Sequence, residues 1–116
     1  MGGMKPSARH ITMTAAISAL LGLVPAAATA ADAAAGKAVF AAKCKTCHAE
    51  DGTGNPAIAK MMKVDLKPLG GAEVQKKSDA ELKAAVSEGT GKMKAVAGVA
   101  GADLDNVVAA VRALKK

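Results

Sequence analysis

Aromatic residues are almost absent from this chain of 116 residues, which contains one phenylalanine and neither tyrosine nor tryptophan. Proteins that bind single-stranded nucleic acid normally stack bases on aromatic side chains, so the net charge of +6 alone does not support a nucleic-acid partner. The same shortage limits the core that side chains alone can bury, and chains this short commonly need an added stabilising element.

Cysteine and histidine are also scarce, since only Cys44, Cys47, His10 and His48 are present. A zinc site needs four nitrogen or sulfur ligands, and His10 lies in a segment that we expect to be removed, so this site is excluded. A thioredoxin-like dithiol is the better alternative, because a neighbouring histidine can lower a thiolate pKa. That fold needs βαβ units, and no alternating apolar run in the chain predicts a sheet.

The N-terminal segment has the pattern of a secretory signal peptide. Lys5 and Arg9 precede an uncharged stretch over residues 11–24, which is followed by the small residues of 26–30. The apolar stretch is shorter than the ~20 residues that span a bilayer, which argues against the alternative, an uncleaved anchor. We expect a signal peptide over 1–30, with cleavage after Ala30 or nearby, Met4 being an alternative start. The domain of residues 31–116 is then exported to the periplasm as a soluble protein without stable membrane insertion.

Helix signals dominate the predicted mature domain, which has 14 basic and 10 acidic residues and so a net charge of +4. Asp32 is placed to cap a helix over 33–43, and a capping box over 78–81 starts a second helix that ends at Gly89. A third amphipathic helix is predicted over 102–114. Glycines and Pro56 make a tight loop of residues 51–56. The fold class is therefore all-α, in one domain.

The segment from Cys44 to His48 reads C-K-T-C-H, the C-x-x-C-H pattern of haem attachment. Positions i and i+3 share one helix face, so both sulfurs can reach the same edge of a planar ligand while His48 turns toward its centre.

Gly36 and Phe40 ahead of this motif, Met93 in a late loop and the amphipathic last helix together resemble the class I c-type cytochromes, the small monohaem cytochromes c. The resemblance implies a bundle of three main helices, with short helices and loops, around one haem c bound by thioether links to Cys44 and Cys47. It also implies His48 and Met93 as axial iron ligands, and a hydrogen bond from His48 to the carbonyl of Pro56.

The chain departs from the family pattern at two positions. Lys94 stands where the family commonly has proline, and Ala110 aligns where the last helix commonly has an aromatic residue. Met61 and Met62 are rival ligands, although methionines in a short helix more often fill gaps around a haem. An open or lysine-bound iron is the remaining alternative.

The resemblance implies an electron carrier rather than an enzyme, with its iron cycling between Fe(II) and Fe(III). One alternative is an electron-transfer subunit of a larger redox complex. Another is a ligand-binding or peroxidatic haem protein with an open sixth site. Against it, the mature chain has no second histidine and no arginine other than Arg112 to build a polar distal pocket.

The expected partners are redox proteins that donate and accept electrons at the exposed haem edge, and the carrier itself is expected to be a monomer. Lysine side chains near the motif and the late loop could steer acidic partners, mainly by raising the association rate. They are Lys43, Lys45, Lys60, Lys63, Lys92 and Lys94.

Overall fold

The computed structural model describes residues 2–4, 22 and 30–116. In that part of the chain the elements are α1 (Ala33–Lys43), α2 (Lys45–His48), α3 (Pro56–Met62), α4 (Ala72–Gln75), α5 (Asp79–Glu88), β1 (Gly89–Thr90), β2 (Met93–Lys94) and α6 (Ala102–Ala113). The predicted all-α fold is confirmed, apart from the two short strands. The predicted signal peptide lies outside the described residues except at positions 2–4, 22 and 30.

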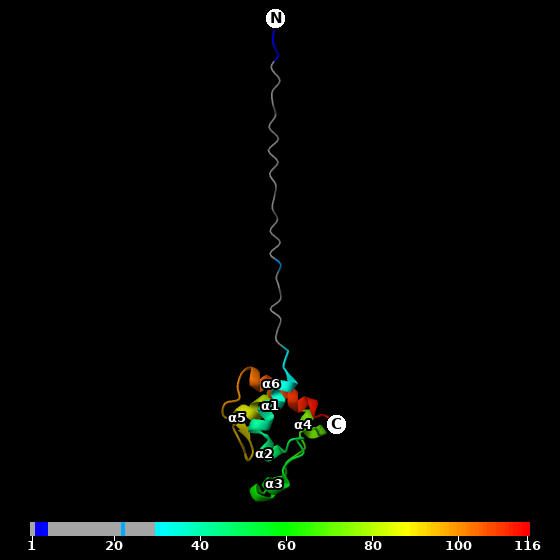
Figure 1. The fold of residues 1–116 in the computed structure, drawn as a ribbon, viewed down its shortest axis with the longest axis vertical. Helices are drawn as coiled ribbons and strands as arrows, with labels where there is room; N and C mark the ends of the chain where they lie inside the picture. The colour runs from blue at the N-terminus through cyan, green and yellow to red at the C-terminus, as the bar shows by residue number, and fades with distance from the viewer. Residues whose placement is uncertain (1, 5–21, 23–29) are drawn as a thin grey trace.

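Helices α1 and α6 form the main packing contact of the domain (Figure 1). The Asp32 carboxylate accepts hydrogen bonds from the N–H groups of Ala34 and Ala35, so α1 begins where the cap predicts. A Cβ atom added at Gly36 would lie 1.8 Å from the backbone oxygen of Asn106, so only glycine lets the two helices approach this closely. The Asn106 side chain in turn accepts from the Asp32 N–H at 2.8 Å.

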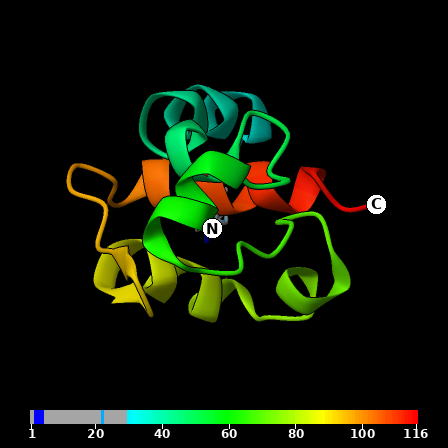
Figure 2. The same cartoon turned by 90° about the horizontal axis from the view of Figure 1, so that it is seen from below.

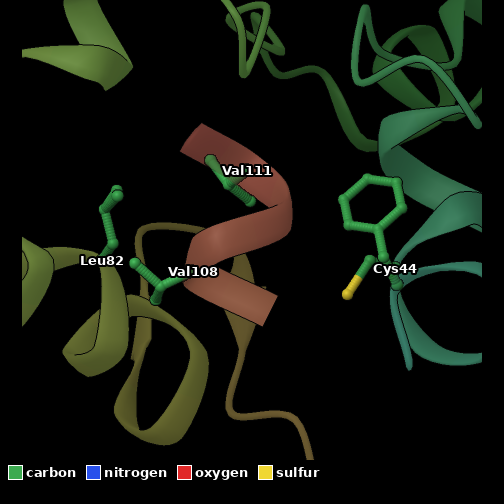
Figure 3. Packing of buried hydrophobic residues seen from close by; sticks show 5 residues of the cluster. Cys44, Leu82, Val108 and Val111 are labelled. Carbon is green, nitrogen blue, oxygen red and sulfur yellow. The ribbon is translucent and has the colours of Figure 1, made fainter. Parts of the chain in front are cut away.

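The buried cluster joins three helices, with α6 between α1 on one side and α5 on the other (Figure 2). Phe40 and Cys44 come from the α1 side, Val108 and Val111 from α6, and Leu82 from α5 (Figure 3). Leu69 and Val74 pack against this cluster from the middle of the chain. The buried residues of α6 lie on one side of the helix, as its predicted amphipathic pattern requires.

Helix α5 is fixed at its start and along its length. Both bonds of the predicted capping box are present: the Ser78 hydroxyl accepts from the Glu81 N–H at 3.1 Å, and the Glu81 carboxylate accepts from the Ser78 N–H at 2.6 Å. The Arg112 guanidinium pairs with Asp79 at 2.8 Å, and Lys83 pairs with Asp105. These ion pairs link α5 to α6 over the solvent-exposed side.

The short strands β1 and β2 form a hairpin in the segment that is predicted as a loop. Thr90 pairs with Met93 across a two-residue turn whose first residue, Gly91, has φ of +55°. A two-residue hairpin turn needs positive φ at that position, which glycine adopts without strain. Strands of two residues are too short to show the alternating pattern from which a strand is predicted.

Candidate functional site

Cys44 lies at the junction of two helices, as the C-cap of α1 and the N-cap of α2. Its carbonyl accepts from the N–H groups of Cys47 at 3.2 Å and His48 at 3.0 Å, so one tight turn holds the whole C-x-x-C-H segment. Both cysteines are free thiols, Cys44 being 8% exposed and Cys47 partly buried. Burial, and then the neighbouring Cys47, raise the pKa of the Cys44 thiol.

His48 is partly buried and follows directly on Cys47. Burial lowers the pKa of its imidazole, which favours the neutral form, the form that ligates metals. Its Nδ1 atom is buried and has no hydrogen-bond partner among the described residues. The predicted hydrogen bond to the Pro56 carbonyl is therefore wrong for this structure. Pro56 is the first residue of α3. In an α-helix the carbonyl of a residue points along the axis toward the N–H four residues later, so the Pro56 carbonyl is directed into its own helix.

Asn55 connects the motif to the next helix, a role that sequence analysis missed. Its side-chain oxygen accepts from the N–H of Ala57 at 3.0 Å and caps α3, while its amide nitrogen donates to the Thr46 carbonyl at 3.1 Å. Its own N–H donates to the Cys47 carbonyl at 2.9 Å. The asparagine immediately before a proline was a usable sign of the cap, but nothing local in the sequence indicates the bond to Thr46.

Met93 belongs to β2, which packs against α5, and its side chain is partly buried. The structure thus places it on an element separate from Cys44, Cys47 and His48, which form one continuous turn. Of the rival methionines, Met61 is 71% exposed at the surface of α3, whereas Met62 is partly buried. Exposure of Met61 weakens its case as a buried ligand.

Many apolar side chains in the middle of the chain are only partly buried. Among the apolar side chains that the structure describes, only Val107 has a relative exposure as low as 2%. The partly buried apolar set from the middle segment comprises Ile58, Met62, Val64, Leu66, Leu69, Val74, Val86, Met93 and Val96. A domain with so small a closed core and so many half-covered apolar groups has apolar surface available for a large apolar group.

Comparisons with known proteins agree with this picture. A family model described as cytochrome C oxidase, cbb3-type, subunit III matches residues 31–110. The chain belongs to this family of c-type cytochrome domains, and it is a small class I c-type cytochrome. The solved structure of KustC0563 c-type cytochrome is 27% identical with a TM-score of 0.58, covering 70% of this chain and 98% of that one. A comparison with curated proteins found no match.

Membership of the family implies a covalently bound haem c and indicates haem-based electron transfer. The residues present fit such a group: two free thiols in one turn, an imidazole with an unpartnered buried nitrogen, and apolar side chains left half covered. Within the part of the chain that the structure describes, no helix is both long and apolar enough to cross a membrane.

Proposed function

We propose that the mature chain is a periplasmic electron carrier with one haem c. Cys44 and Cys47 form the thioether links, and His48 and Met93 are the two axial ligands of the iron. The observation that carries the proposal is the C-K-T-C-H turn, because it presents a buried thiol, a second thiol one turn later and a partly buried imidazole within five consecutive residues.

In this proposal the residues of the chain hold the haem and shield its iron. When bound, the haem supplies a one-electron couple between Fe(II) and Fe(III). His48 and Met93 would together hold the iron, which would leave small molecules no open coordination site. A thioether ligand from Met93 and the partly buried apolar side chains of the middle segment would favour the reduced iron over the oxidised one. The chain therefore needs no acid, base or nucleophile of its own.

Electron exchange takes place with redox proteins, which we propose carry acidic docking surfaces, and the carrier is a monomer. All six lysines proposed to face a partner are exposed in the structure: Lys43, Lys45, Lys60, Lys63, Lys92 and Lys94. Such charges act mainly on the association rate, which falls as salt rises. Export fits the pattern of residues 1–30 and the attachment of haem outside the cytoplasmic membrane.

A second candidate is an electron-transfer subunit of a larger redox complex, which the description of the matching family favours. The same ligands would then serve, but between fixed neighbours. Gel filtration of a native extract separates the two cases, because a free carrier elutes as a small protein and a subunit elutes with its complex.

The test of the ligand set is the optical spectrum of the oxidised holoprotein, matured in a periplasm. A weak far-red charge-transfer band reports a bond between methionine sulfur and ferric iron. We expect this band in the unmutated protein and in Met61→Ala and Met62→Ala, and its loss in Met93→Ala. Absence of the band from the unmutated protein at neutral pH, or its loss in Met62→Ala alone, would contradict Met93 as the ligand.

A further inference from the structure

The hairpin that carries Met93 is held at its base by the backbone. The N–H of Val96 donates to the carbonyl of Val86 at 2.8 Å, which ties the chain after β2 to the last turns of α5. Gly89 has φ of +83°, and a Cβ atom there would lie 2.6 Å from the Met93 carbonyl oxygen, so the base of the hairpin is tightly packed. Beyond the pairing of Thr90 with Met93, no backbone hydrogen bond among the described residues ties the turn at Gly91 and Lys92 to another element.

The tip of the hairpin is held instead by one side chain. The Lys92 ammonium donates to the backbone carbonyl of Met62 at 2.7 Å, across thirty positions of sequence. Met62 is the last residue of α3, and Lys63 after it has the left-handed φ of +53° that ends the helix. The bond therefore joins the Met93 hairpin to α3, an element of the middle segment.

The chemistry of both partners favours this bond. The last carbonyls of a helix lack intrahelical donors and carry the negative end of the helix dipole, so an ammonium group is stabilised there. A hydrogen bond from a charged donor is stronger than one between neutral groups. Lys92 is next to Met93, so whatever fixes its side chain also limits the movement of the Met93 backbone.

We propose that Lys92 is a positioning residue that holds the Met93 hairpin closed by its bond to the Met62 carbonyl, in a chain that has Lys94 where a proline would stiffen the loop. The inference rests on the proposed function, because it concerns how Met93 is kept at the iron. Lys92 is also one of the six lysines proposed to face a partner, but in this role it acts through the Met62 carbonyl and does not touch the iron. Its loss leaves the ligands in place but lets the loop leave the iron more often.

The test uses the oxidised holoprotein with Lys92→Met, which keeps the length of the side chain and removes the donor. Lys94→Met is the matched control, because it removes the same charge from an exposed position of the same hairpin. We expect Lys92→Met to retain the far-red band at neutral pH and to bind imidazole, which competes with Met93 for ferric iron, about fivefold more tightly than the unmutated protein. Lys94→Met should bind imidazole as the unmutated protein does. Lys92→Arg, which restores a charged donor, should bring the imidazole affinity most of the way back to that of the unmutated protein.

Amide hydrogen exchange supplies a readout that does not depend on a ligand. In Lys92→Met the Met93 amide should exchange about fivefold faster, whereas the Val96 amide, held by Val86, should not change. If the unmutated protein lacks the far-red band, the proposed ligand set and this inference both fail. If it has the band and Lys92→Met matches Lys94→Met in imidazole affinity and in exchange, only the role of Lys92 is overturned.

Discussion

The pair of helices α1 and α6 and the segment of residues 49–101, which lies between them in the sequence, are held together by different interactions. Helix α6 contributes four buried residues and α1 two, and their backbones meet at Gly36. Within residues 49–101, by contrast, α3 and α4 have no buried residue, and the buried apolar side chains are only Leu82 of α5 and Val99. The middle segment is held by hydrogen bonds at its turns and by ion pairs, among them the bonds of Asn55, Gln75 and Arg112.

This difference indicates which interactions stabilise the helix pair and which stabilise the middle segment. Side chains that pack against each other stabilise the helix pair directly, in proportion to the apolar area they remove from water. The middle segment leaves apolar side chains half covered, and exposed hydrogen bonds and ion pairs contribute little on their own. We therefore expect the middle segment to depend on the haem much more than the helix pair does.

The largest effect should come from removing the haem attachment. In a Cys44→Ala/Cys47→Ala apoprotein we expect a poorly folded chain whose amides over 49–101 lose protection from hydrogen exchange, with residual protection confined to α1 and α6. The measurement is residue-resolved exchange against the holoprotein. Native-like protection across 49–101 in the apoprotein would show that the middle segment is stable by itself.

The next largest effect should come from the helix contact. Gly36→Ala forces a Cβ into the backbone of Asn106, so we expect a loss of about 3 kcal/mol in the free energy of unfolding, measured by denaturant titration of the holoprotein. Ala38→Gly, on the exposed face of the same helix, is the control and should cost about 1 kcal/mol from helix propensity. Helix propensity alone predicts that Gly36→Ala raises the free energy of unfolding. That result would mean that the two helices are not in close contact.

Truncating one side chain in each region compares the two directly. Val107→Ala removes buried methyl groups from α6 and should lower the free energy of unfolding by about 2 kcal/mol. Met61→Ala on α3 should change it by less than about 0.5 kcal/mol, because that side chain is already 71% exposed. Equal losses in the same denaturant experiment would place Met61 in a packed interior.

The smallest effect concerns pH. The hydrogen bond from the Ser78 N–H, followed by the one from the Ser78 hydroxyl group, holds the pKa of Glu81 below its ordinary value. Because the folded pKa is lower than the unfolded one, this stabilisation is present above the unfolded pKa and is lost as pH falls through the folded pKa. Glu81→Gln should therefore flatten the acid side of the curve of unfolding free energy against pH.

Glu88→Gln is the control for that curve, because it removes the same charge at the other end of α5 without touching the capping box. An acid side that is the same in Glu81→Gln and the unmutated protein would show that the capping box does not contribute to acid stability.

Features that depend on neighbouring residues were predicted well. The caps at Asp32 and Ser78 are formed as expected, and the predicted helices over 33–43 and 102–114 agree with α1 and α6 within one residue. Features that join distant residues were missed or wrong. The bond of Lys92 to Met62 and that of Asn55 to Thr46 had no local signal, and the bond expected at Pro56 is not formed because that residue starts a helix.

The sequence by itself determined the helix ends, the all-α class and the C-x-x-C-H turn, because each depends on groups within a few positions along the chain. Only the tertiary structure decided that Gly36 meets Asn106, that Met93 lies in a hairpin against α5, and that Lys92 reaches the end of α3. Such contacts depend on the packing of all the elements together, since a bond between distant residues forms only after the chain between them has folded.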